Sequence, residues 1–227
     1  MTRPLRLVIF DVDGTLIDSQ DYILAAMRRA FGAAGLPTPT DQATLGIVGL
    51  SLPQAMEVLI PGLAQPARDR LVTLYKQSFL AIRQETGGEA LSPFYPGARD
   101  ALDRLDRAGY LMSIATGKAR RGLNHMLDSH GLQPLFVGTQ TADDAPSKPH
   151  PGMVLNCLAA TGVDPRDAVV VGDTEFDMAM AVAAGARAIG VSWGYHGAER
   201  LERGGAERIL DRFEALDEAL GDIWETA

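Results

Sequence analysis

The sequence has one cysteine, no long apolar run and too few basic residues to balance its acidic ones, and each shortage excludes a class of protein. Cys157 is the only cysteine in the 227 residues, so neither an internal disulfide nor a cysteine metal cluster can form. The longest apolar-rich segment, 178–191, is interrupted by Gly185 and Arg187 and falls short of the roughly 18 apolar residues of a membrane span. The first residues also lack the apolar stretch of a secretion signal. We therefore expect a cytoplasmic protein with no membrane contact.

The charge balance argues against a nucleic-acid partner. The chain has 21 Lys and Arg against 29 Asp and Glu, a formal net charge of -8. Non-specific affinity for nucleic acid comes from basic residues that neutralise phosphates, and no basic run is present. An acidic protein can still bind a small phosphorylated metabolite where a few cations and backbone amides converge.

Three short apolar runs each end in a polar cluster. They cover residues 5–10, 110–115 and 168–171, and the clusters that follow read DVDGT, TGK and GDT. A helical pattern comes after each cluster, which is typical of parallel strands in a doubly wound α/β sheet. The sequence also predicts weaker strands at 135–137, 188–191 and 208–210, and helices at 99–108, 151–161 and 174–184.

Residues 17–96 contain no strand-like run, and a segment of this length is too long for a simple connection in a compact α/β domain. Apolar residues recur at helical spacing within 23–34 and 71–82. The sequence thus predicts a doubly wound parallel, Rossmann-like sheet with an inserted all-α helical-bundle cap domain. We place the core in residues 1–16 and 92–227 and the cap in residues 17–91.

The carboxyl ends of parallel strands meet at one edge of a sheet, so the polar clusters are expected to converge there. They bring together Asp11, Asp13, Thr15, Thr116, Asp173 and Asp177, with Lys148 from a nearby loop. Clustered carboxylates repel one another and need a cation, and oxygen ligands favour Mg²⁺ over zinc. A lysine, a threonine hydroxyl and turn amides suit a phosphoryl group that bridges to such a metal.

Four segments, in order along the chain, resemble the haloacid dehalogenase-like hydrolases with a helical cap, such as phosphoglycolate phosphatases and β-phosphoglucomutases. They are FDVDGTLIDS at 10–19, TGK at 116–118, SKPHP at 147–151 and VGDTEFD at 171–177. The resemblance extends over nearly the whole chain. It implies the same Rossmann-like core and cap that the patterning predicts.

The resemblance implies that Asp11 is the nucleophile and forms an aspartyl-phosphate, which divides hydrolysis into two easier steps. It implies that Asp13 is the general acid and base. Thr116 and Lys148 would bind the transferring phosphoryl group and offset its charge. Gly117, also a candidate for phosphate binding, stands where the family often has asparagine, and its lack of a side chain affects the positioning of substrate or of the adjacent loop.

The resemblance also implies a metal site. Asp11, the main-chain carbonyl of Asp13 and Asp173 would hold Mg²⁺. Asp177 is expected near the metal or in contact with the catalytic lysine. Thr15 is expected to support the geometry of Asp13 and to lie among the phosphate-binding residues.

The most favoured function is a Mg²⁺-dependent phosphatase of a small phosphomonoester, with phosphoglycolate as the first candidate. Asp13 favours phosphate chemistry over dehalogenation, whose enzymes typically lack this acid. The alternatives are a β-phosphoglucomutase-like sugar phosphomutase, a pyrophosphatase and a non-catalytic receiver-like module. The loop 46–50 offers no basic residue to hold a sugar phosphate in two orientations. Both a monomer and a homodimer are compatible with the sequence.

Several motif residues also have purely structural interpretations. Ser51 fits a capping box at the start of a cap helix, and so does Thr174 with Asp177. Trp193 and Tyr195 are expected to pack near the crevice. The histidines show no metal-ligand spacing, so exposed or core positions are expected for His125, His130, His150 and His196.

Overall fold

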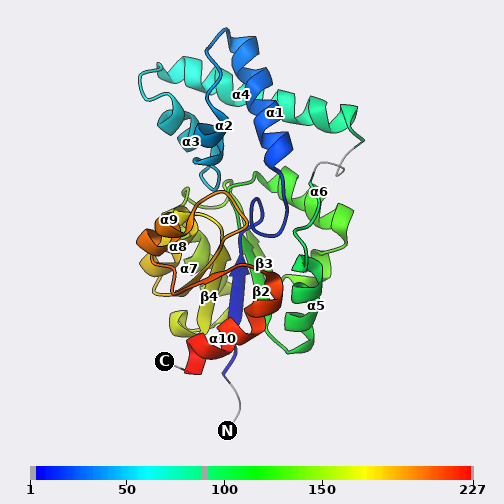
Figure 1. Ribbon diagram of the computed structural model, residues 1–227, viewed down its shortest axis with the longest axis vertical. Coiled ribbons are helices and arrows are strands. Elements are labelled where there is room, and N and C mark those ends of the chain that lie inside the picture. The colour runs from blue at the N-terminus through cyan, green and yellow to red at the C-terminus, as the bar shows by residue number, and fades with distance from the viewer. Residues whose placement is uncertain (1–3, 88–91, 226–227) are drawn as a thin grey trace.

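The computed structural model describes residues 4–87 and 92–225. Within them the chain forms a six-stranded parallel sheet in the order β3-β2-β1-β4-β5-β6, with a group of helices beyond the carboxyl ends of its strands (Figure 1). The strands are β1 (Leu7–Phe10), β2 (Leu111–Ala115), β3 (Gly138–Gln140), β4 (Ala168–Gly172), β5 (Arg187–Val191) and β6 (Arg208–Leu210). The predicted doubly wound α/β fold is confirmed.

Helices cover both faces of the sheet (Figure 1). One face carries α5 (Ala98–Arg107), α6 (Arg120–His130) and α10 (Leu216–Glu225), and the other carries α7 (Gly152–Thr161), α8 (Glu175–Ala183) and α9 (Ala198–Gly204). In β1, Val8 and Phe10 belong to the first of these cores and Leu7 and Ile9 to the second. All four are fully buried, because successive side chains of a strand point to opposite faces and here both faces are covered.

The inserted segment is helical, as predicted. It contains α1 (Gln20–Ala34), α2 (Asp41–Leu45), α3 (Leu52–Leu59) and α4 (Gln65–Glu85). Helices α1, α3 and α4 share a core of their own, in which Met27, Phe31, Met56 and Leu71 are buried. The limits of the cap, 17–91, remain a prediction. No helix in the described ranges is both long and apolar enough to cross a membrane.

The strand predicted at 135–137 was wrong. A short 3-10 helix occupies Gln133–Leu135, and β3 follows at Gly138–Gln140. Pro134 has no N–H to donate to a strand ladder and a fixed φ that suits a helical turn. The residues of β3 are small or polar and only half-buried at the sheet edge, so no apolar run marks them. The weaker predictions at 188–191 and 208–210 were confirmed by β5 and β6.

Candidate active site

The candidate site lies where the strand order reverses, between β1 and β4. Ligands of doubly wound sheets bind outside the carboxyl ends of the strands at such a point. Asp11 follows β1 directly and Asp173 follows β4. The N–H of Asp11 still donates to the carbonyl of Val171 at 3.0 Å, which holds the two strand ends side by side. Thr116 follows β2 and is also buried, so the predicted convergence of these side chains is present.

Lys148 is buried between two carboxylates. Its Nζ lies 2.8 Å from Oδ1 of Asp11 and 2.5 Å from Oδ1 of Asp177, and all three side chains are at most 1% exposed. Burial alone would lower the pKa of Lys148, but the two carboxylates raise it above its usual value. The lysine is therefore a charged group of the site and not a solvated loop residue.

Asp177 has a second task at the start of α8. Its Oδ2 accepts hydrogen bonds from the N–H of Thr174 at 3.1 Å and from the Thr174 hydroxyl at 2.6 Å. The Thr174 hydroxyl also accepts from the N–H of Asp177 at 3.3 Å, which completes the predicted capping box. The predicted capping box is confirmed, and Asp177 also contacts Lys148.

One oxygen of Asp11 is free to react. Its Oδ2 is buried and has no hydrogen-bond partner among the described residues, while Oδ1 is paired with Lys148. Burial raises the pKa of Asp11 to about 7, against the opposing effect of the lysine. A buried carboxylate oxygen without a donor is available to an electrophile or a cation.

Asp11, Asp173 and Asp177 form an acidic cluster that suits a divalent cation. Their nearest oxygens lie within 4.8 Å of one another, and all three residues are buried. Burial raises the pKa of Asp173 well above its usual value, and the neighbouring carboxylates raise it further. A bound divalent cation would relieve this repulsion, and a donor set made only of carboxylate oxygens suits such an ion.

Asp173 is fixed by two segments that are distant in sequence. The Thr15 hydroxyl donates to its Oδ1 and the Tyr195 N–H to its Oδ2, both at 2.9 Å. Trp193 Nε1 in turn donates to the Thr15 carbonyl at 3.1 Å. Thr15 thus supports Asp173 and not Asp13, contrary to expectation, and Trp193 and Tyr195 do more than pack against the crevice.

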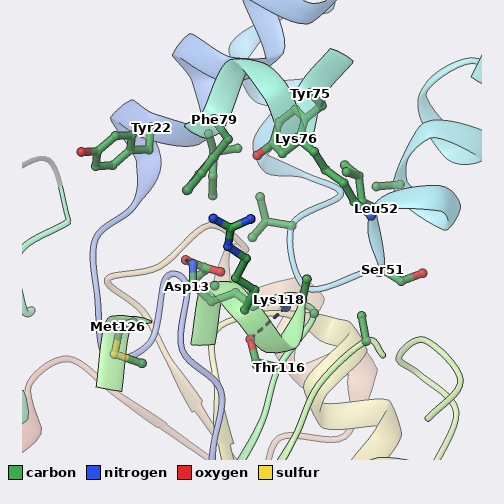
Figure 2. A pocket seen from close by; sticks show the side chains of 18 of the residues that line it. Asp13, Tyr22, Ser51, Leu52, Tyr75, Lys76, Phe79, Thr116, Lys118 and Met126 are labelled. Atoms are coloured by element: carbon green, nitrogen blue, oxygen red, sulfur yellow. Dashed lines mark hydrogen bonds and ion pairs between the residues drawn. The ribbon is translucent and has the colours of Figure 1, made fainter. Parts of the chain in front are cut away.

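Asp13 points into the cavity and has two partners that the sequence analysis did not single out. Lys118 Nζ lies 2.5 Å from its Oδ1, and the Ser19 hydroxyl donates to the same oxygen (Figure 2 shows Asp13 with Lys118). Both partners lie within the motif segments 10–19 and 116–118, but only the packing of the first loop against the second brings them to Asp13. They hold the carboxylate in one place at the edge of the site.

The loop of residues 46–51 between α2 and α3, called the cap loop below, reaches the site. The N–H of Ser51 donates to Oγ of Ser147 at 2.7 Å. A Cβ atom on Gly117 would lie 2.7 Å from the carbonyl oxygen of Gly49 and 2.8 Å from that of Leu50, so a side chain there would push the loop away. Ser51 does begin α3, but its side chain makes no capping hydrogen bond, so the predicted capping box is wrong.

A cavity of about 790 Å³ separates the acidic cluster from the cap helices. Asp11, Asp13 and Thr116 line its floor, and side chains of α1 and α4 line the opposite side (Figure 2). The arrangement places the unpartnered oxygen of Asp11, the hydroxyl of Thr116 and the carboxylate of Asp13 beside one half-open cavity, with the ammonium of Lys148 next to Asp11.

Comparison with known proteins agrees with this geometry. Residues 8–191 match the family model described as haloacid dehalogenase-like hydrolase. The chain belongs to the haloacid dehalogenase-like hydrolases. The match covers all four motif segments and the whole inserted helical region, so the resemblance seen in the sequence is confirmed.

Individual relatives of this hydrolase are phosphatases. A probable phosphatase, IndB of Dickeya dadantii, is 34% identical over 209 residues, which cover 91% of this chain and 90% of the relative. A phosphoglycolate phosphatase of Vibrio parahaemolyticus is 27% identical over 96% of this chain and 97% of its own. Among solved structures, a hydrolase from Pseudomonas syringae superposes with a TM-score of 0.84 at 26% identity, over 97% of this chain and 99% of that chain. The expected enzyme class, a phosphoric monoester hydrolase, agrees with these relatives.

His196 was expected only in an exposed or core position, but the structure places it in contact with both the core and the cap loop. The ring is buried, its Nδ1 accepts from the N–H of Glu175 at 3.1 Å, and its Nε2 lies 3.2 Å from the carbonyl of Gly46 in the cap loop. Since Nδ1 accepts, the proton is on Nε2 and the neutral ring donates to the cap. Burial lowers the pKa of His196 to about 4, and the positive charge of nearby Arg200 adds to this effect.

Proposed function

We propose that this hydrolase is a Mg²⁺-dependent phosphatase of small phosphomonoesters that acts through an aspartyl-phosphate on Asp11. The observation that carries the proposal is the free, buried Oδ2 of Asp11 beside the charged Lys148 at the floor of the cavity. A nucleophile that approaches an anionic phosphate needs its own charge offset, and Lys148 provides this at 2.8 Å.

In the first step Oδ2 of Asp11 attacks phosphorus, and the bond from phosphorus to the leaving oxygen breaks. Asp13 gives its proton to that oxygen, so the alcohol leaves neutral. In the second step Asp13 takes a proton from water as the water attacks phosphorus, which releases phosphate and restores the Asp11 carboxylate. Thr116 donates its hydroxyl to the phosphoryl oxygens, with Gly117 beside it.

Asp11, Asp173 and the main-chain carbonyl of Asp13 would hold Mg²⁺. The ion would polarise the phosphoryl oxygens and offset the charge that develops on them. Asp177 positions Lys148, and Thr15 positions Asp173. The Thr15 hydroxyl is therefore excluded from the proposed phosphate contacts, because its proton is already donated to Asp173.

Residues 17–91 act as the cap in this proposal, over a core of residues 1–16 and 92–227. The cap helices line the cavity opposite the nucleophile, so a bound ester is enclosed between the two units. Enclosure excludes bulk water and protects the aspartyl-phosphate until the correct water attacks.

The test is phosphate release from a panel with Mg²⁺ and with EDTA. The panel contains phosphoglycolate, hexose phosphates and pyrophosphate. Release that needs the metal supports the proposal, whereas isomerisation of a hexose phosphate without release would identify a phosphomutase. Preference for pyrophosphate would identify a pyrophosphatase, and no turnover at all would favour a receiver-like module.

Asp11→Asn is the decisive variant, because it removes the nucleophile and keeps the volume of the side chain. We expect turnover to fall by at least about a thousandfold in a variant that still folds. Retained turnover in a folded variant would refute the assignment of Asp11.

A further inference from the structure

The cavity above the nucleophile is larger than a two-carbon phosphate ester requires. Its volume of about 790 Å³ falls within the range of pockets that enclose drug-sized ligands. The cap loop closes one side of this cavity and already touches the core. Ser51 is hydrogen-bonded to Ser147, and Gly49 lies against Gly117. Further approach of this loop cannot remove the space, so the space is available to the substrate.

The side of the cavity that faces the catalytic floor carries three aromatic side chains. Tyr22 of α1 and Tyr75 and Phe79 of α4 line it (Figure 2). The ring centroids of Tyr22 and Phe79 are 5.4 Å apart, and those of Tyr75 and Phe79 are 6.2 Å apart. The Tyr22 hydroxyl is bonded to Thr86 Oγ1 at 2.6 Å, and Figure 2 shows it directed away from Asp13. The three rings therefore give this side of the cavity an aromatic surface, and Lys76 and Arg83 of α4 line the cavity beside it.

This aromatic surface begins next to the point where the leaving group departs. Lys118 Nζ lies 2.5 Å from Asp13 Oδ1 and 6.0 Å from the centroid of the Phe79 ring. In the proposed reaction Asp13 protonates the leaving oxygen, so that oxygen lies beside Asp13. The carbon skeleton attached to it then extends past Lys118 toward Phe79.

We propose that the substrate is the phosphate ester of an alcohol that bears a ring, and that Phe79 is a specificity-determining residue that packs against this ring. The inference rests on the proposed phosphatase function and names its substrate class. A ring stacked on Tyr75 and Phe79 would bury apolar surface that a two-carbon acid leaves in contact with water.

The experiment compares 2-phenylethyl phosphate with ethyl phosphate and phosphoglycolate. All three esters release an alkyl alcohol, so the phenyl group is the main difference between the first two. We expect kcat/KM for 2-phenylethyl phosphate to exceed that for ethyl phosphate by about tenfold or more. Phe79→Ala should bring this ratio close to one, mainly through KM, and Phe79→Leu should keep part of it.

Val58→Ala is the matched control, because Val58 is an exposed cap residue of α3 outside the cavity lining, and this variant should keep the wild-type ratio. Turnover of phosphoglycolate or ethyl phosphate equal to or better than that of 2-phenylethyl phosphate in the wild-type protein would overturn this inference and leave the phosphatase function standing. A ratio unchanged in Phe79→Ala would overturn the role of Phe79. Absence of Mg²⁺-dependent release from every ester would overturn the proposed function, and this inference with it.

Discussion

The N–H of Ser51 donates to Oγ of Ser147 at 2.7 Å, and this bond joins the cap loop before α3 to the core loop that carries Lys148. The two residues are 96 positions apart in the chain. The serine next to Lys148 therefore has a partner in the cap loop, so the position of this loop and the position of the lysine are linked.

Ser147→Ala should weaken the attachment of the cap loop. Loss of one hydrogen bond of this kind costs about 1 kcal/mol, which is about fivefold in the population of the attached loop. We expect KM to rise by a similar factor with a smaller change in kcat, measured by initial rates on the best ester of the panel. Ser147→Thr keeps the hydroxyl and serves as the control, and an unaltered KM in Ser147→Ala would show that the bond does not hold the loop.

Lys148→Met should destabilise the fold as well as abolish activity. Removal of the ammonium leaves Asp11 and Asp177 facing each other in a buried site, and breaking such a pair from one side costs about 3 kcal/mol or more. Urea unfolding at pH 8 in EDTA measures the loss. The difference in unfolding free energy between wild type and Lys148→Met should be smaller at pH 5, because a protonated Asp11 no longer needs a counter-charge. A difference that does not change with pH would contradict this account.

His196 should make the protein less stable in mild acid. Its pKa is about 4 in the folded protein and near 6.5 when unfolded, so the unfolded state binds the proton more readily. The stability it contributes is complete above pH 6.5 and is lost as the pH falls toward 4, by about 2 kcal/mol at pH 5. The raised pKa of Asp11 contributes the opposite slope, so the measured quantity is the difference between wild type and His196→Gln.

Unfolding free energies at pH 7.5 and pH 5 give that difference. Wild type should lose more stability than His196→Gln over this interval, because glutamine does not titrate. Equal losses in the two proteins would mean that the ring is charged, or accessible to water, in the folded state.

Cys157 should be unreactive until the protein unfolds. The thiol is buried on α7, with Sγ 3.9 Å from the carbonyl of Ile114, and burial raises its pKa to about 12. Since the thiolate is the reactive species, a disulfide reagent such as DTNB should modify no thiol in the native protein at pH 8. About one equivalent should react in guanidinium chloride. Rapid modification of the native protein would show that α7 opens readily.

Patterns within single segments were enough to predict most of the fold and the floor of the site. The apolar runs that became β1, β2 and β4 each deliver a polar side chain to the same edge, so Asp11, Thr116 and Asp173 could be placed from local sequence. By contrast, β3 carries no apolar run, since its residues sit half-buried at the sheet edge.

Contacts between distant segments could not be predicted in this way. The Lys118 to Asp13 ion pair needs the first and second motif loops to meet, and the His196 to Gly46 bond needs the cap to dock on the core. The spacing of residues along the sequence indicates neither contact, because the two partners belong to separate elements of the fold. The close approach of the cap loop to Gly117 explains, after the fact, why glycine suits that position.

Asp177 uses one oxygen to start α8 and the other to hold Lys148. A single carboxylate thus couples the assembly of a core helix to the charge balance around the nucleophile. The start of α8 and the ion pair of Lys148 therefore depend on the same side chain. A substitution of Asp177 would disturb the helix and the charge balance of the site together.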